Sequence, residues 1–279
     1  MPIFTLIHTQ FMDVIPYPDT DFSGKTIIVT GANIGLGKEA VKHFVRLNAE
    51  KVIVAVRSIA KGEAAKSEIE AETKRTGVVD VWGLDYSSYA SVKAFAAKVA
   101  KLSRVDAVVL NAGIATANFE LFEDNESTIT VNVVSTTLLA LLLLPTLRTY
   151  PVSKLLQLFA VREIADRTAN KKPLVIINAV NPGLCHTSLS RSATGVSFIV
   201  MTVLKTLLAR SAEKGSRTLV HGTTVGPESH GIYISGCLVK NNALGEFVTS
   251  PEGQKAQKKV WGELVVKLED ICPGITKGL

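Results

Sequence analysis

Residues 27–41, IIVTGANIGLGKEAV, join a short apolar strand to a helix through a turn that contains Gly31, Gly35 and Gly37. A glycine directly after a strand lets the chain turn sharply. A second glycine lets backbone N–H groups approach a phosphate at the positive end of a helix, and a third lets the helix pack closely on the sheet. The stretch therefore predicts a strand–turn–helix unit that holds a pyrophosphate.

Strand and helix patterns alternate on both sides of this unit. Apolar strands are expected at 25–30, 51–56, 78–84, 105–111, 174–180 and 232–235, and helices at 35–47, 61–74, 87–100, 126–144, 151–167, 211–221 and 251–268. Strands rich in Val and Ile without polar alternation are typical of parallel sheets covered by helices on both faces. The predicted fold class is α/β, a doubly wound, Rossmann-like parallel sheet.

One strand is missing from the alternation. Two helices follow each other between residues 126 and 167, with no strand between them. The first helix descends about 28 Å at roughly 1.5 Å per residue. Residues 145–149 then span at most roughly 17 Å when extended. The sequence therefore predicts a sheet that lacks one central strand.

The chain is expected to form an N-terminal arm, residues 1–24, and one dinucleotide-binding domain, residues 25–279, with a substrate-covering segment at about 184–210. The arm has no basic leader and carries three prolines before residue 23, which argues against a signal peptide and favours the cytoplasm. The apolar windows 138–144 and 196–209 fall short of the ~18 to 20 residues of a membrane span. For the second window, a cover over the substrate is favoured over a weak membrane contact.

Composition excludes few functions. The formal charge is +6, but basic residues are scattered, so a solvated basic surface is favoured over a nucleic-acid site. The three cysteines lie far apart without nearby histidine pairs, which predicts neither zinc nor a disulfide framework and no metal site. A reducing compartment fits this cysteine usage.

The glycine loop predicts a dinucleotide although its spacing, G-x-x-x-G-x-G, differs from the G-x-G-x-x-G fingerprint. Asn33 and Leu36 of the same loop are counted among the cofactor contacts. The second strand ends at Arg57, with no acid at its end. An arginine there suits the 2′-phosphate of NADP, whereas NAD would favour an acid. The alternative for Arg57 is a solvated surface arginine.

Two polar residues follow later strands. Asp85 either accepts a hydrogen bond from the adenine amino group or caps the helix expected from residue 87. Asn111 begins an NAG motif at the end of the fourth strand. It either binds the backbone of a turn or lines the adenosine half of the site.

Tyr150 and Lys154 stand four residues apart, so on a helix beginning at Pro151 they would share one face. A neighbouring ammonium favours the phenolate and lowers the pKa of a phenol. Such a tyrosine can protonate a carbonyl oxygen or deprotonate an alcohol. The pair alone is a weak pattern.

Four motifs occur in order: TGANIGLG, NAG, YPVSK and NPGLCHT. With them the sequence resembles the short-chain dehydrogenase/reductase family of the TGxxxGxG type, from about residue 25 to residue 250. The segments RSIAKGEAA, NPGLCHTSL and SAEKGSRTLVHG are similar to its retinol-dehydrogenase-like branch and to reductases of fungal secondary-metabolite pathways. The resemblance implies an NAD(P)-dependent oxidoreductase that interconverts a carbonyl and a secondary alcohol on a small apolar metabolite.

By this resemblance, Tyr150 is the acid/base, and Lys154 is its activator and a ribose ligand. Asn132 holds the water that links Lys154 to bulk solvent; from the residues alone, it is a polar side chain bonded locally within an apolar helix. Thr187, with Pro182 and Gly183, contacts the nicotinamide end. The leucines at 138–144 either pack against a second copy, as in the family's homodimers, or belong to the core.

The family also has a serine on a fifth strand, about a dozen residues before the tyrosine. Counting back from Tyr150 reaches Thr136 and Thr137, which lie on the expected helix. The chain is therefore expected to have weak or no activity. The alternative function is a non-catalytic, truncated family member that at most binds nucleotide or a partner. The retained Tyr150, Lys154 and Asn132 favour the enzyme.

Overall fold

The structure of the chain is a computed structural model that describes residues 14–116, 118–144, 150–151, 155–172, 174–187, 202, 205–206, 208–239, 244 and 246–279. Its strands are β1 (Thr26–Thr30), β2 (Lys51–Val56), β3 (Val79–Gly83), β4 (Ala107–Val109), β5 (Leu121–Phe122), β6 (Asn125–Glu126), β7 (Tyr150–Pro151), β8 (Ile177–Asn181), β9 (Tyr233–Ser235) and β10 (Leu238–Val239). Its main helices are α2 (Gly35–Arg46), α3 (Ile59–Thr73), α4 (Tyr89–Val99), α6 (Thr136–Leu143), α7 (Leu155–Thr168), α9 (Ala212–Gly222) and α11 (Pro251–Ile271). Shorter helical pieces are α5 (Ser127–Ile129), η1 (Thr130–Ser135), η4 (Pro227–Ser229) and α10 (Glu246–Thr249).

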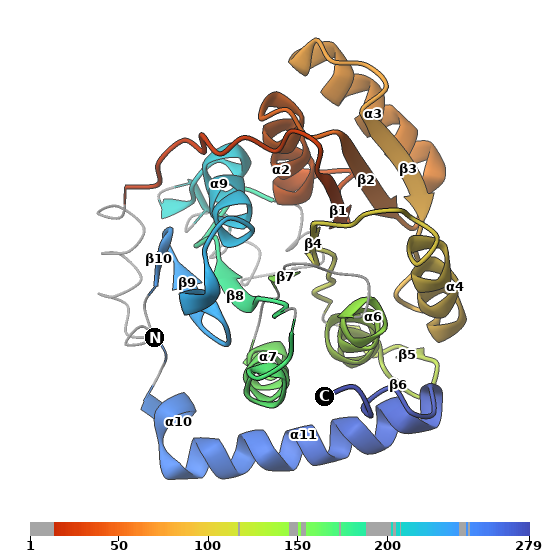
Figure 1. Cartoon of the computed structure of the whole chain (residues 1–279), viewed down its shortest axis with the longest axis vertical. Coiled ribbons are helices and arrows are strands. Elements are labelled where there is room, and N and C mark those ends of the chain that lie inside the picture. Colours follow the sequence, from red (N-terminus) through yellow and green to blue (C-terminus); the bar gives the residue numbers. More distant parts are fainter. Residues whose placement is uncertain are drawn as a thin grey trace.

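The central sheet has two halves. One half has the strand order β3-β2-β1-β4, and the other has the order β10-β9-β8-β7. All these pairs are parallel except β9 with β10. Figure 1 shows the halves side by side, with β7 between β4 and β8. The predicted α/β class with a Rossmann-like parallel sheet is confirmed.

Helices cover both faces of the sheet because the strands are apolar on both sides. On one face, α2, α3 and α9 pack on the strands through residues such as Phe44, Ile69 and Val220. On the other face, α4, α6 and α7 bury residues such as Phe95 and Leu139. The helix α11 lies outside α6 and α7, along the lower edge of the molecule in Figure 1.

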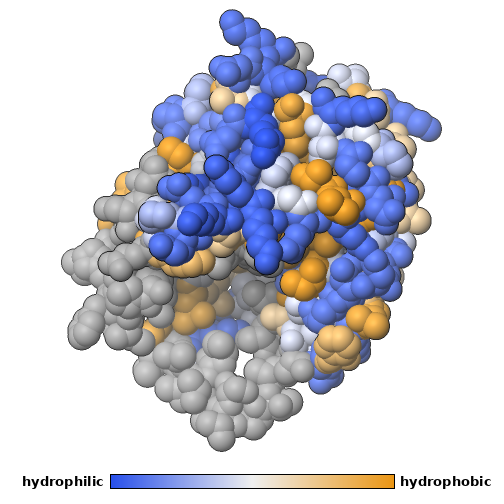
Figure 2. All heavy atoms as spheres, turned by 90° about the horizontal axis from the view of Figure 1, so that it is seen from below, coloured by the Kyte–Doolittle hydropathy of each residue, from blue (hydrophilic) through white to orange (hydrophobic). Residues whose placement is uncertain are grey.

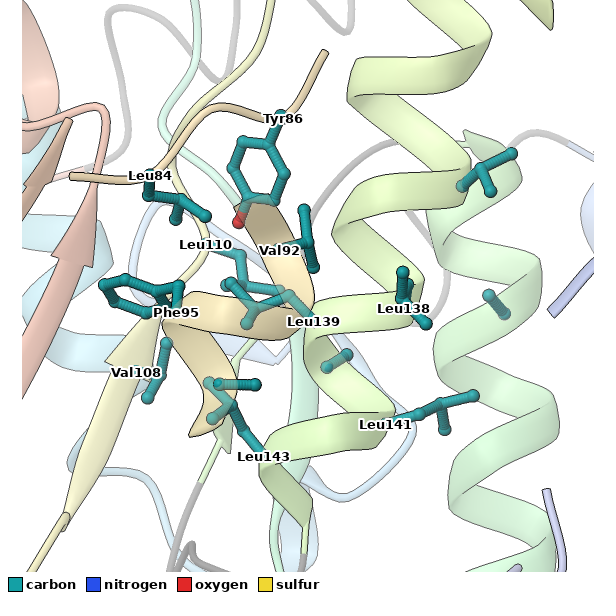
Figure 3. Packing of buried hydrophobic residues seen from close by; sticks show 14 of the residues in the cluster. Leu84, Tyr86, Val92, Phe95, Val108, Leu110, Leu138, Leu139, Leu141 and Leu143 are labelled. Carbon is teal, nitrogen blue, oxygen red and sulfur yellow. The ribbon is translucent and has the colours of Figure 1, made fainter. Parts of the chain in front are cut away.

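The leucine run of α6 belongs to this core. Leu138, Leu139, Leu141 and Leu143 are all at most 3% exposed. Leu139 and Leu143 point toward α4 and β4, whereas Leu141 points toward the neighbouring helix (Figure 3). Of the two roles considered for these leucines, packing within one chain is therefore the one that the structure supports.

The helix expected at 126–144 is broken by the π-helix η1. The Thr136 hydroxyl donates to the Val131 carbonyl, five residues earlier, at 2.8 Å. The Thr130 hydroxyl donates to the Phe122 carbonyl at 2.8 Å. Such side-chain bonds compete with the regular helical pattern, and π-turns are frequent at functional sites. No periodic pattern in the sequence predicts this break.

The strand β7 corrects two expectations. Tyr150 pairs with Ile177 and Pro151 pairs with Asn178, so Pro151 does not begin a helix, and α7 begins at Leu155 instead. The residue before a proline disfavours helical backbone and prefers an extended one. An extended segment also supplies hydrogen-bond partners to β8. In the described residues, the expected gap in the sheet thus holds a strand of two residues.

Membrane spans, metal sites and the ends of the predicted segments were also considered from the sequence. No helix among the described residues is long and apolar enough to cross a membrane. The described part of the chain contains no group of three His, Cys, Asp or Glu side chains placed to hold a metal ion. Residues 1–13 of the arm, and most of the covering segment and of the window 196–209, lie outside the described residues. The single domain at 25–279 stays a prediction.

Candidate active site

Gly31 makes the first turn of the glycine loop. Its φ angle of +65° is in the left-handed region, and an added Cβ would lie 2.8 Å from the Cα of Ala112. Its N–H donates to the Ala55 carbonyl at 2.8 Å. Both the backbone conformation and the close approach to the residue after β4 therefore require glycine here.

The first turn of α2 lies beside the glycine turn. The helix begins at Gly35, its preceding residue Ile34 makes no side-chain cap, and its first turn carries no acidic side chain. The N–H groups of a first turn have no partners within their own helix and carry a partial positive charge. An anion is the ligand that such a terminus favours.

Asn111 fixes the glycine turn. Its Nδ2 donates to the carbonyl of Thr30 at 2.9 Å and to that of Gly31 at 3.3 Å. A Cβ on Gly37 would lie 2.5 Å from this Nδ2, so Gly37 makes room for the amide. Of the two alternatives for Asn111, binding the backbone of the turn is realised, and the residue also lines the cavity described next.

A cavity of about 750 Å³ opens along the carboxyl ends of β1, β2, β4 and β8. This edge is where ligands bind in open α/β sheets. Its lining includes eight of the residues expected to bind a cofactor: Gly31, Asn33, Gly35, Leu36, Arg57, Asp85, Asn111 and Thr187. Gly37 and Asn132 are not in the lining, but each contacts a residue that is: Gly37 contacts Asn111, and Asn132 contacts Ile114.

Arg57 stands exposed at the end of β2, and Lys61 lies on the first turn of α3 beside it. Ser58 caps α3 by accepting a hydrogen bond from the Lys61 N–H at 3.4 Å. No described residue forms an ion pair with the Arg57 guanidinium. Two cations at one end of the cavity favour an anionic group there.

Asp85 closes the turn before α4. Its Oδ1 accepts hydrogen bonds from the N–H of Ser87 at 2.9 Å and from the Ser87 hydroxyl at 2.7 Å. The N-cap of α4 is Ser88, whose side chain accepts from the Ser91 N–H, so Asp85 is not the residue that caps this helix. Asp85 thus stabilises the turn before the helix, and it also lines the cavity; its contact with an adenine stays a prediction.

Asn132 joins the π-helix to the loop after β4. Its Oδ1 accepts from the Ile114 N–H at 2.9 Å, and its Nδ2 donates to the Ile114 carbonyl at 2.8 Å. Ile114 follows the NAG motif and lines the cavity. The polar residue inside an apolar helix therefore holds one wall of the site in place.

Tyr150 lies in the strand β7, so the expectation that it stands on a helix is wrong. Lys154 lies outside the described residues. Thr187 is near the glycine loop, because a Cβ on Gly35 would lie 3.6 Å from its Cγ2. Pro182 also lines the cavity, and Gly183 turns beside it with a φ of +77°.

Two cavity residues escaped the sequence interpretation. Tyr86 is buried, and its hydroxyl, which lies near the hydroxyls of Thr30 and Thr136, points into the core in Figure 3. Tyr233 lies on β9, is partly exposed and lines the cavity. Both are single aromatic residues without a motif; the turn after β3 places Tyr86 at the site, and the pairing of β9 with β8 places Tyr233 there.

Known proteins match both the sequence and the fold. The family described as short chain dehydrogenase matches residues 25–153. The short chain dehydrogenase/reductase dmxR8 of Cryptosporiopsis sp. is 43% identical over 323 residues, covering 97% of this chain and 98% of the relative. The chain belongs to the short-chain dehydrogenase/reductase family. Members of this family are oxidoreductases, and the resemblance based on the four motifs is confirmed.

The alignment with dmxR8 also shows a difference in length. It runs over 323 positions, whereas this chain has 279 residues in all, so dozens of residues of the relative have no counterpart here.

Solved structures share the fold. An uncharacterized protein from Mycobacterium paratuberculosis has a TM-score of 0.66 at 24% identity, covering 90% of this chain and 94% of its own. A short chain dehydrogenase of Shigella flexneri, complexed with NADP, has a TM-score of 0.58 at 20% identity, covering 78% and 99%.

Proposed function

We propose that the chain belongs to a lineage of NADP(H)-dependent oxidoreductases of secondary metabolism. Its reaction interconverts a carbonyl and a secondary alcohol on a small, mostly apolar metabolite. The observation that carries the proposal is the cavity, which joins the glycine turn, the uncapped start of α2 and Arg57 along one sheet edge. NADPH, when bound, supplies the hydride.

The residues present fit this cofactor. Gly31 lies so close to Ala112 that there is no room for a Cβ on Gly31. Because Gly31 has no side chain, backbone N–H groups of the turn are accessible to a pyrophosphate. Arg57, with no described ion-pair partner, is free to hold a 2′-phosphate through charge-assisted hydrogen bonds. The absence of an acid at the end of β2 disfavours NAD.

The rest of the lining supports an apolar substrate. Leu110, Phe122, Val131, Val180 and Leu219 all face the cavity. Pockets of mainly apolar lining bind apolar ligands and use a few polar groups for orientation. Asn132 keeps the Ile114 loop at the wall of this pocket.

The rival function is nucleotide binding without catalysis. One observation favours it: Tyr150 pairs with the first residue of β8, whereas the cavity lies at the other end of that strand. The unmatched residues in the alignment with dmxR8 support a lost segment. In this case the glycine turn would still bind NADP, while Tyr150 would contribute no proton transfer.

Two measurements separate these functions. NADPH is titrated into the purified protein while its fluorescence is followed, and NADPH oxidation is then measured with a reactive 1,2-diketone. Saturable NADPH binding with slow turnover supports the oxidoreductase. Saturable binding with no turnover above the protein-free rate supports the rival, and no binding at all overturns both.

A further inference from the structure

The hairpin β5–β6 supplies one wall of the cavity. Phe122 lines the cavity, whereas Leu121 beside it is 62% exposed, as expected for side chains that alternate along a strand. The Phe122 carbonyl accepts from the Thr130 hydroxyl at 2.8 Å. Its side chain packs against the core cluster that contains Leu84, another residue of the lining. The ring of Phe122 therefore faces the inside of the molecule.

This hairpin lies at the end of the cavity nearest to β3. Tyr89, the first residue of α4, bonds it twice: the Tyr89 N–H donates to Glu123 Oε1 at 2.8 Å, and the hydroxyl accepts from Asn125 Nδ2 at 3.0 Å. The end of β3 pairs with the end of β2, directly before Arg57. In the proposed function Arg57 holds the 2′-phosphate, so the adenosine half of the nucleotide occupies this end of the cavity.

The turn of the hairpin depends on contacts with other elements. Glu123 has a φ of +57°, in the left-handed region that residues other than glycine seldom adopt. The two strands have only two residues each, and a hairpin alone is marginally stable. Strained backbone persists only where the surrounding structure over-determines it. The contacts that hold the turn therefore decide where Phe122 stands.

The C-terminal helix α11 supplies one of these contacts. Lys267 Nζ forms an ion pair with Asp124 Oδ2 in the turn of the hairpin. Figure 1 shows the end of α11 beside β5 and β6. Leu264 and Leu268 of α11 are 6% and 0% exposed, so the core holds this helix in place. The ion pair thus joins the turn to a fixed helix.

We propose that Lys267 is a positioning residue: through Asp124 it holds the hairpin so that the Phe122 ring packs against the adenosine half of NADP(H). This role rests on the proposed function. Lys267 itself is not in the cavity lining and acts only through the hairpin. Bases gain affinity by stacking on aromatic side chains. Among the apolar lining residues, Phe122 then serves the nucleotide, whereas Val180, on β8, lies toward the other end of the sheet edge.

The test is a double-mutant cycle in which NADPH affinity is measured by fluorescence titration. Lys267→Ala removes an ion pair at the surface and should weaken NADPH binding about two- to fivefold. Phe122→Ala removes the ring and should weaken it about tenfold. In the Phe122→Ala background, Lys267→Ala should have no further effect, because the ring through which it acts is gone. The charge swap Lys267→Asp with Asp124→Lys should restore most of the affinity.

Lys259→Ala is the matched control. Lys259 lies on α11, and its ion pair with Glu263 is exposed on both sides, so NADPH affinity should not change. A second readout needs no nucleotide. The Ser127 N–H donates to the Glu120 carbonyl at 2.8 Å at the base of the hairpin. Its hydrogen exchange in the free protein should become faster in Lys267→Ala and stay the same in Lys259→Ala.

The outcomes separate this role from the proposed function. An unchanged NADPH affinity in Lys267→Ala, or an equal loss in the presence and absence of the Phe122 ring, overturns the positioning role. Unchanged hydrogen exchange of the hairpin overturns it as well. Absence of NADPH binding in the wild type overturns the proposed function instead, and the exchange of the free protein still decides whether Lys267 holds the hairpin.

Discussion

The backbone of Tyr150 pairs with Ile177, the first residue of β8, and not with Asn181 at the cavity end of the same strand. These two positions are four residue steps apart, which span about 13 Å at roughly 3.3 Å per step. The Tyr150 backbone is therefore displaced along β8, away from the end that borders the cavity. This register is a physical reason to expect low catalytic activity of the chain.

Restoring the strand should therefore restore turnover. A segment that contains a β-strand and the serine of the family pattern is inserted between Arg148 and Thr149. A complete strand would carry the chain back to the cavity edge before Tyr150. NADPH oxidation with a 1,2-diketone should rise at least tenfold over the chain as it stands. An insert of equal length made of Gly and Ser serves as the control, and unimpaired turnover of the unmodified chain would contradict the displacement.

Arg57 is predicted to select NADP. Arg57→Ala removes charge-assisted hydrogen bonds of about 1.5–3 kcal/mol, which corresponds to roughly 10- to 100-fold weaker NADPH binding. NADH binding should stay within about twofold, because NADH lacks the 2′-phosphate. Lys66→Ala, on α3 but outside the cavity lining, is the matched control for a change in net charge. Equal losses for both nucleotides would show that Arg57 is a solvated surface residue.

Gly31 should tolerate no side chain. Gly31→Ala places a Cβ 2.8 Å from the Ala112 Cα at a φ of +65°. The free energy of unfolding should fall by about 2 kcal/mol or more, and NADPH binding should weaken with it. Gly262→Ala provides the contrast, because that glycine lies in α11 with nothing within 4 Å of an added Cβ. Its helix should gain about 0.5–1 kcal/mol, and urea unfolding measures both.

The sequence predicted the elements that carry their own pattern, and it failed where tertiary partners decide. The strand 51–56 was predicted to the residue, because a run of buried Val and Ile needs no context. The extended backbone of Tyr150 was not predicted, because pairing with β8 outweighs the helical spacing of Tyr150 and Lys154. The same holds for the site. Glycine and asparagine motifs located the nucleotide edge, whereas Tyr233 becomes visible only through its register with Ala179.

Acid should destabilise the contact between α2 and α9 through His43. His43 is fully buried, its Nε2 lies 3.1 Å from Glu213 Oε1, and its ring packs edge-on against Tyr17. Burial lowers the pKa of His43 below its ordinary value of 6.5, and the charge of Glu213 offsets only part of this effect. The folded state therefore binds fewer protons than the unfolded chain. This contribution to stability is complete above pH 6.5 and is lost as the pH falls below it.

The measurement compares the wild type with His43→Gln in urea from pH 8 to pH 5. The wild type should lose up to about 2 kcal/mol more than the variant between pH 6.5 and pH 5. His221, whose pKa burial also lowers, is present in both proteins and cancels in the difference. Parallel pH profiles would mean that His43 is protonated as easily in the folded state as in the unfolded chain.

The face where a second copy was considered is covered by α11. Trp261, Leu264 and Leu268 of this helix belong to the same buried cluster as the leucines of α6 and residues of α7. Gln257 Nε2 donates to Glu163 Oε1 of α7 at 2.9 Å. Seen from below in Figure 2, the coloured residues on this side are mainly hydrophilic, with hydrophobic residues between them.

Self-association through α6 should therefore require that α11 be loosened first. Leu264 is 6% exposed and Val266, two residues away, is 72% exposed, so the same helix offers a test position and its control. Leu264→Glu puts a charge into the apolar contact and should raise the mass measured by light scattering, whereas Val266→Glu should leave it unchanged. A wild-type dimer that Val266→Glu dissociates would reverse this view, because the contact would then lie on the outer face of α11 and not on the leucines beneath it.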